Sequence, residues 1–253
     1  MSVSIKTEAE IELMAEGGRR LAEVLRALEK ETAPGVTTKH LDRAAYRMIH
    51  ELGAKPAFLH YRPAGARKEY PYTLCASIND VIVHGQPSDY AVRDGDLVKL
   101  DLGLIYKGWY LDSAVTVAVG TVSREAKKLM AATREALAAG IAEARPGKTL
   151  GDVGHAIGDV VRRNKFSAAE GLIGHGVGRE LHEDPAVFNF GKRGGGEPLE
   201  EGMVIAIEPM VCAGGGATIE RRDDSYATRD GSLAAHFEHT VAITPRGPRI
   251  LTE

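Results

Sequence analysis

Cysteine and long apolar runs are both scarce in this sequence of 253 residues. Its two cysteines, Cys75 and Cys212, are too few for a disulfide framework and indicate reduced thiols in a cytosolic protein. No apolar run approaches the length of a membrane span, and the N-terminus lacks the apolar core of a signal peptide. These absences predict a protein of the cytoplasm without membrane association.

A strong charge of one sign is also missing. The chain carries 32 basic and 35 acidic side chains, for a net charge of -3. No block of Lys and Arg is long enough to form a phosphate or membrane patch, so we expect no nucleic-acid site. The length suffices for one large domain with a buried core.

The apolar pattern predicts two helices in each half of the chain, with Pro-Gly pairs at 34–35 and 146–147 ending the first helix of each pair. Thr37 or Thr38 is expected to cap the second helix. The order of helices and strands then repeats, which predicts two pseudo-symmetric α-α-β halves, about 1–120 and 121–253, around a central antiparallel sheet. The expected helices are 8–31, 37–52, 123–144 and 149–164; the expected strands are 74–77, 81–84, 97–105, 109–119, 171–174, 203–208 and 237–243.

Two aspartates lie in the alternating segments 97–105 and 109–119, which read as a β-hairpin. If the turn centres near Tyr106 and Lys107, Asp101 lies directly opposite Asp112. Two carboxylates about 5 Å apart repel each other, so this arrangement needs a shared proton or a bound cation. The alternative is a turn offset by one residue, which sends one aspartate to the solvated face.

The second half adds two histidines, His175 and His182, in the glycine-rich segment Gly174-His-Gly-Val-Gly-Arg-Glu-Leu-His182. Its spacing fits neither a phosphate-binding loop nor the His-Glu-x-x-His helix of zincins. Glu208 and Glu238 lie in strongly apolar strands, where an uncompensated carboxylate is costly to bury.

Asp101, Asp112, His175, Glu208 and Glu238 together form a set of four carboxylates and one imidazole. Such a set suits two divalent ions from the Mn, Fe, Co and Zn range. A pair of ions can activate water and polarise a scissile carbonyl, so the pattern predicts metal-assisted hydrolysis.

Five segments, in order, closely resemble methionine aminopeptidase of the bacterial type I. The resemblance covers nearly the whole chain and implies the pita-bread fold in a single catalytic domain, 1–253. It also implies a dinuclear enzyme that removes the initiator methionine from nascent chains when the second residue is small. We expect it to act as a monomer, at the ribosome. The segments are Ser77-Ile-Asn-Asp-Val-Ile-Val-His-Gly85, Asp94-Gly-Asp-Leu-Val-Lys-Leu-Asp101, Gly174 through Pro185, Gly202-Met-Val-Ile-Ala-Ile-Glu-Pro-Met210 and Phe237-Glu-His-Thr240.

The resemblance assigns roles to individual residues. It implies that the five acidic and histidine residues above are the metal ligands, and that Glu208 is also the general base. His84 would contact the scissile amide and help to move protons, and His182 would bind the substrate carbonyl and stabilise the oxyanion. Tyr70 and Cys75 would line the methionine pocket.

Some positions leave alternatives open. His239 either supports the neighbouring ligand or points to the opposite face. The family commonly has an aromatic residue where this chain has Leu181, and the segment 58–69 looks longer than usual. A proline-specific aminopeptidase or dipeptidase of the same fold is the nearest rival, although those enzymes usually carry an extra N-terminal domain. A catalytically inactive binding module is the other alternative, but such relatives typically lose metal ligands.

Overall fold

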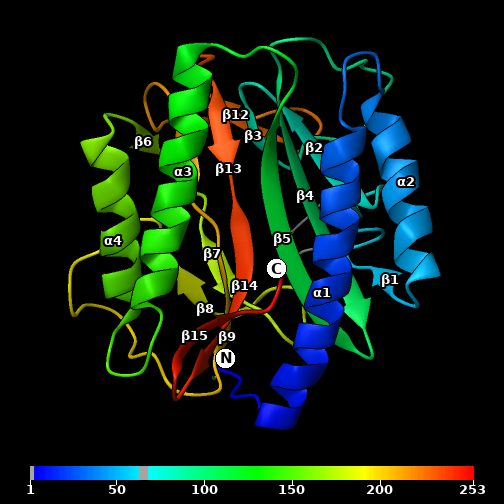
Figure 1. Ribbon diagram of the computed structural model, residues 1–253. Helices are drawn as coiled ribbons and strands as arrows, with labels where there is room; N and C mark the ends of the chain where they lie inside the picture. Colours follow the sequence, from blue (N-terminus) through cyan, green and yellow to red (C-terminus); the bar gives the residue numbers. More distant parts are fainter. Residues whose placement is uncertain (1–2, 63–67) are drawn as a thin grey trace.

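A curled antiparallel sheet forms the centre of the molecule, and the four long helices lie outside it (Figure 1). The computed structural model describes residues 3–62 and 68–253, so part of the long segment 58–69 lies outside the described residues. The first two helices flank one side of the sheet in Figure 1, and the last two flank the other. The helices are α1 (Glu8–Glu31), α2 (Thr38–Glu51), α3 (Arg124–Glu143) and α4 (Leu150–Arg163).

The central sheet has nine strands, with the path β1-β4-β5-β14-β9-β7-β8; β2 also pairs with β4, and β15 with β14. Two three-stranded sheets, β13-β10-β6 and β11-β12-β3, lie beside it. The strands are β1 (Lys55–Pro56), β2 (Leu74–Ile78), β3 (Val81–Val83), β4 (Leu97–Tyr106), β5 (Trp109–Ala118), β6 (Ser167–Ala168), β7 (Gly174–Gly176), β8 (Glu183–Val187), β9 (Val204–Ile207), β10 (Met210–Cys212), β11 (Thr218–Glu220), β12 (Tyr226–Thr228), β13 (Ala234–His236), β14 (Glu238–Thr244) and β15 (Gly247–Ile250).

The helices begin where the sequence predicts. Thr7 and Thr149 form capping boxes with Glu10 and Asp152, and the Thr37 side chain accepts a hydrogen bond from the backbone of His40. Each cap satisfies backbone N–H groups that the first helical turn leaves free. The N-cap of α2 is therefore Thr37 rather than Thr38.

The expected strand at 171–174 is wrong: strand pairing starts only at Gly174, where β7 begins. A Cβ at Gly174 would lie 2.4 Å from the carbonyl oxygen of Ala206, and one at Gly176 would lie 2.2 Å from that of Asp184. Only glycine allows β7 to approach its two neighbouring strands this closely. These glycines therefore hold His175, which lies between them, against the centre of the sheet.

The predicted hairpin forms, but its register differs from the expected one. Tyr106 pairs with Trp109, so the turn consists of Lys107 and Gly108, both with positive φ. That conformation is typical of a two-residue type I′ turn. As a result Asp101 pairs with Ala114 and Gly103 pairs with Asp112, and the aspartates are not directly opposite each other.

The shift nevertheless keeps both aspartates on one face of the sheet. Side chains alternate between faces with a period of two residues, and Asp112 is two positions from Ala114, the partner of Asp101. The aspartates are therefore diagonal neighbours. The alternative of one aspartate on the solvated face is also wrong, because both side chains are buried.

Three hydroxyl groups join the two halves along the seam between β5 and the strands β13 and β14. Ser113 Oγ donates to the carbonyl oxygen of Glu238 at 2.7 Å. Thr240 Oγ1 donates to the carbonyl oxygen of Asp112 at 2.8 Å and accepts from its N–H at 3.1 Å. Thr116 Oγ1 likewise donates to the carbonyl oxygen of His236 and accepts a hydrogen bond from its N–H. The seam thus places residues from both halves side by side.

Candidate metal centre

The five predicted ligands converge on the inner face of the sheet. Asp101 and Asp112 come from the adjacent strands β4 and β5 of the first half, and His175 comes from β7. Glu208 directly follows β9, and Glu238 begins β14. All four carboxylate residues are buried, and the His175 side chain is 13% exposed. The five residues singled out in the sequence therefore lie close together, and their role as metal ligands stays a prediction.

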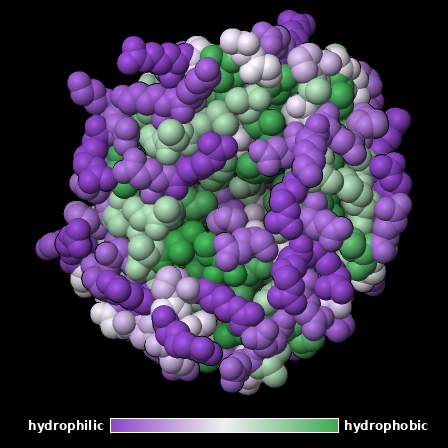
Figure 2. All heavy atoms as spheres, viewed as in Figure 1, coloured by the Kyte–Doolittle hydropathy of each residue, from purple (hydrophilic) through white to green (hydrophobic). Residues whose placement is uncertain are grey.

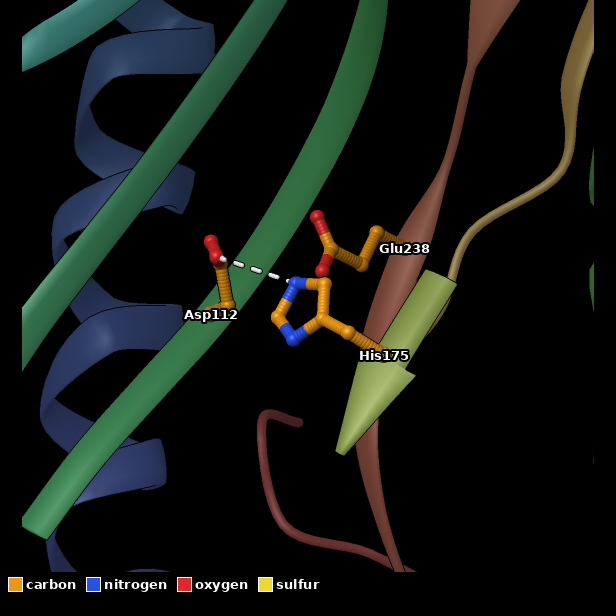
Figure 3. Close-up of side chains that lie close together, drawn as sticks. All are labelled: Asp112, His175 and Glu238. Carbon is orange, nitrogen blue, oxygen red and sulfur yellow. Dashed lines mark ion pairs between the residues drawn. The ribbon is translucent and has the colours of Figure 1, made fainter. Parts of the chain in front are cut away.

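Asp112, His175 and Glu238 point toward one another (Figure 3), and one ligand atom of each lies within 4.8 Å of the others. His175 Nε2 is 4.0 Å from Asp112 Oδ2. The other nitrogen, Nδ1, is 2.8 Å from the carbonyl oxygen of Gly176, so it donates there and Nε2 keeps its lone pair for the cluster.

A second triad shares Glu238 with the first and contains Glu208 and His236, again with ligand atoms within 4.8 Å of one another. Two carboxylate oxygens in the combined cluster, Asp112 Oδ1 and Glu238 Oε1, are buried without a hydrogen-bond partner among the described residues. Buried charged oxygens are normally paired or coordinate a metal. The donor set and these orphaned oxygens fit bound divalent cations.

Burial raises the pKa of every carboxyl group in the cluster. Desolvation raises the pKa of Asp101 and of Glu208 to about 7. It raises those of Asp112 and Glu238 well above the ordinary range, and the neighbouring carboxylates raise them further. The protein alone therefore does not stabilise four negative charges here, whereas a cation would.

These raised pKa values predict how the stability of the metal-free protein depends on pH. Above about pH 7, the buried imidazoles with lowered pKa are neutral in both the folded and the unfolded state. Near pH 7, Asp101 and Glu208 still hold part of the protons that the unfolded chain has released, and the pKa values of Asp112 and Glu238 are raised in the same direction. Because the folded state binds more protons, its stability falls as the pH rises through the folded-state pKa values. We expect Tm of the chelated protein to fall as the pH rises through about 7, measured by calorimetry.

The metal-loaded protein is the control for this measurement, because bound cations keep the carboxylates ionised and remove the proton linkage. Its Tm should change less over the same pH interval. Identical pH dependence with and without chelator would contradict the assignment of this carboxylate cluster to a cation site.

His84 and His182 lie at the same centre. The His182 ring meets that of His175 edge to face with centroids 4.4 Å apart, and His84 meets Tyr226 at 5.8 Å. Solvent reaches both rings, yet the surrounding protein lowers the pKa of His84 to about 4 and that of His182 to about 3, chiefly through desolvation. Both imidazoles are neutral at pH 7 and can donate or accept one hydrogen bond each.

Tyr70 and Cys75 lie in an apolar cluster next to the ligands. Cys75 pairs directly with Asp101 across β2 and β4, so its side chain lies on the ligand face. Burial raises the pKa of this thiol well above its usual range, which keeps it neutral. Leu181 packs in the same cluster, as do Ala57 and Phe58. Tyr70 Oη donates to the carbonyl oxygens of Leu74 and Gly85 at 3.0 and 3.2 Å.

His239 points to the opposite face of the sheet. Its Nδ1 is 2.9 Å from Thr252 Oγ1, and its ring lines a groove of about 580 Å³ between α1 and α3. Figure 2 shows this region as a green hollow bordered by hydrophilic side chains. The alternative in which His239 supports the metal ligands is therefore wrong.

Two residues of the site were missed by the sequence analysis. His236 lies two positions before Glu238 and therefore on its face, and the i, i+2 spacing was a signal that could have identified it. Tyr61 Oη lies 2.6 Å from His182 Nδ1. Nothing local to Tyr61 in the sequence indicates this contact, because the two residues are 121 positions apart.

Comparison with known proteins assigns this chain to a family. Residues 12–245 match metallopeptidase family M24, so the chain belongs to that family. The methionine aminopeptidase of Aquifex aeolicus is 46% identical over 259 residues, which cover 100% of both chains. The predicted resemblance to methionine aminopeptidases is thereby confirmed over the full length.

Solved structures agree with this assignment. The crystal structure of methionine aminopeptidase from Thermotoga maritima has a TM-score of 0.95 and 41% identity, and the match covers 100% of both chains. The prolidase from Pyrococcus furiosus has a TM-score of 0.79 and 25% identity, and the match covers 98% of this chain but 65% of the prolidase. The expected α+β pita-bread fold is confirmed.

Among the described residues, none of the helices combines the length and the apolar character that crossing a membrane requires.

Proposed function

We propose that this chain is a metal-dependent aminopeptidase that hydrolyses the N-terminal methionine from nascent proteins and peptides, preferably when the second residue is small. One observation carries the proposal: ligand-type side chains from both halves converge in a buried cluster, in a chain similar to methionine aminopeptidases over its full length. We further propose two divalent ions (Co, Mn, Fe or Zn) held by Asp101, Asp112, His175, Glu208 and Glu238. The working protein would be a cytoplasmic monomer with one catalytic domain, 1–253, meeting nascent chains at the ribosome.

When bound, the ions would supply Lewis-acid polarisation of the scissile carbonyl and activation of water. Glu208 is the proposed general base, which takes the proton from the attacking water and returns it to the departing amine. Its carboxylate lies between two imidazoles, with Oε1 3.6 Å from His175 Nε2 and Oε2 3.3 Å from His236 Nε2.

His182 is the proposed oxyanion donor. Tyr61 Oη lies 2.6 Å from His182 Nδ1. In the proposed tautomer the ring proton is on Nε2, so that the Tyr61 hydroxyl donates to Nδ1 and Nε2 is free to donate to the developing oxyanion. The loop that carries His182 is held by the buried pair of Lys6 Nζ and Glu183 Oε2 at 2.7 Å. His84 would contact the scissile amide and help to move protons.

The apolar cluster around Cys75 is the proposed methionine pocket. A linear thioether fits among Tyr70, Cys75 and Leu181, and its sulfur gains weak contacts with the ring edges. Leu181 in place of an aromatic residue removes one such ring contact. Because the cluster adjoins Asp101, a side chain bound here would present its peptide bond to the metal ligands.

The test of the function is a panel of Met-Xaa and competing peptides, read as kcat/KM. A methylene or branch point in an apolar pocket is worth about 1–3 kcal/mol, so Met should exceed Leu by roughly tenfold to a few hundredfold. Ala, Gly or Ser should be accepted as the second residue, and Lys or Phe refused. Faster hydrolysis of Ala-Pro than of Met-Ala peptides would replace this proposal with the proline-specific alternative.

A second prediction concerns the histidines. Replacing His182 or His84 with Ala should lower kcat by about 10²–10³, the range for loss of one oxyanion donor or proton shuttle. KM should change much less, because these groups act in the transition state. Tyr61→Phe should lower kcat by a smaller factor, since the ring of His182 stays in place but loses its fixed tautomer.

The control variant is His50→Ala, because His50 is exposed on α2 and contacts only Tyr46 among aromatic rings of the described residues. It should retain the kcat of the unmodified enzyme. Wild-type kcat in His182→Ala would remove His182 from the mechanism.

A further inference from the structure

His236 is a buried histidine that is not among the five proposed metal ligands. Its relative exposure is 1%, and neither ring nitrogen forms a hydrogen bond to any described residue. An imidazole carries one N–H and one lone pair, and leaving both unsatisfied inside a protein is unfavourable. The position therefore requires a partner for the ring.

The surroundings of the ring indicate what that partner is. His236 Nε2 lies 3.3 Å from Glu208 Oε2 and 3.8 Å from Glu238 Oε2, without the geometry of a hydrogen bond to either. Donor atoms about 2.0–2.2 Å from one metal ion are separated by about 3.0–4.2 Å, depending on the angle between them. Both distances lie within that interval.

The backbone of His236 is also held firmly. Thr116 Oγ1 donates to its carbonyl oxygen at 2.7 Å and accepts from its N–H at 2.9 Å. Thr116 itself is fully buried on β5. This double hydrogen bond fixes His236 across the seam between the two halves, as expected for a residue whose ring position matters.

The two triads have the same composition. One contains His175 with Asp112 and Glu238, and the other contains His236 with Glu208 and Glu238. Each therefore offers one imidazole and two carboxylates, with Glu238 common to both. In addition, the two oxygens of Glu208 face the two imidazoles, one each.

We propose that His236 is a sixth metal ligand, so that each of two ions receives one imidazole nitrogen. This inference rests on the proposed function, because it adds a ligand to the same dinuclear centre. The alternative role is hydrogen bonding to Glu208 without coordination, which the experiments below distinguish.

A second imidazole changes the expected metal preference. Imidazole favours Zn, Fe and Co, whereas sites of carboxylate alone favour Mn and Mg. His236→Gln should therefore weaken the binding of one Zn or Co ion by at least about tenfold, and should weaken Mn binding less. Isothermal titration of the chelated protein with Zn, Co or Mn measures both affinities.

The visible absorption spectrum of the Co(II)-loaded protein reports the ligands independently of activity. It should change in His236→Gln, because a nitrogen ligand is lost from one ion. The matched control is His239→Gln, since His239 lies three residues further on and points to the opposite face. That variant should keep the metal affinities and the spectrum of the unmodified protein.

X-ray absorption spectroscopy of the unmodified protein tests the inference without any variant. Outer-shell scattering should show one imidazole per ion at full Zn or Co loading. One imidazole per two ions, or unchanged affinities and spectrum in His236→Gln, would overturn the inference and leave the proposed function intact. Failure of the unmodified protein to bind any divalent ion would instead overturn the proposed function itself.

Discussion

Replacing Glu238 with Gln is expected to abolish hydrolysis. Glu238 belongs to both triads, so the substitution removes a carboxylate from each proposed ion site at once. A bound ion contributes several kcal/mol to charge stabilisation in the transition state, which corresponds to roughly a thousandfold or more in kcat. Peptide hydrolysis and metal content by elemental analysis should both fall.

The same substitution should have the opposite effect on the stability of the chelated protein. Burial and the neighbouring Asp112, Glu208 and Asp101 raise the pKa of Glu238, so its ionised carboxylate is unfavourable when no cation is bound. A neutral amide removes this repulsion. We expect the chelated Glu238→Gln variant to melt at the same temperature as the chelated unmodified protein or higher.

Asp96→Asn provides the matched control for this experiment. Asp96 is also buried, but it accepts hydrogen bonds from Asn79, Tyr90 and the backbone of Arg93. Its substitution should lower Tm equally with and without metal and leave metal content unchanged. A Glu238→Gln variant that retained full activity would remove Glu238 from the metal centre.

Glu208→Gln should lower kcat by about 10²–10⁴, the usual contribution of a general base. The amide can still offer an oxygen ligand, but it cannot accept the proton of the attacking water. KM should remain close to its original value, because substrate binding does not use this proton transfer. Steady-state kinetics over a range of metal concentrations measures the effect.

The metal titration separates the two roles of Glu208. If excess metal restored the original kcat in Glu208→Gln, the residue would be a ligand only, and another group would be the base. A loss of kcat that persists at saturating metal supports proton transfer by Glu208.

Local periodicity predicted much of this molecule. Thr37, one of the two candidate caps of the second helix, acts within a single helical turn, so the residues around it are sufficient to identify it. The shared face of Asp101 and Asp112 likewise depends only on the two-residue period of a strand, which tolerates a shift of the strand pairing by an even number of positions.

The register itself was predicted wrongly. Pairing depends on which two residues occupy the turn, and the positive φ at Lys107 and Gly108 moves the turn one residue along the chain. That choice reflects the twist of the two flanking strands as well as the turn residues themselves. The segment 97–119 alone left the register open.

The sequence by itself determined the four helices, the two acidic strands and, through the resemblance, the five proposed ligands. Tertiary structure alone decided that His236 lies within reach of Glu208 and that Tyr61 reaches His182. The physical reason is range. Periodicity and caps act over a few residues, whereas these contacts join residues far apart in the chain; Tyr61 and His182 are separated by 121 positions.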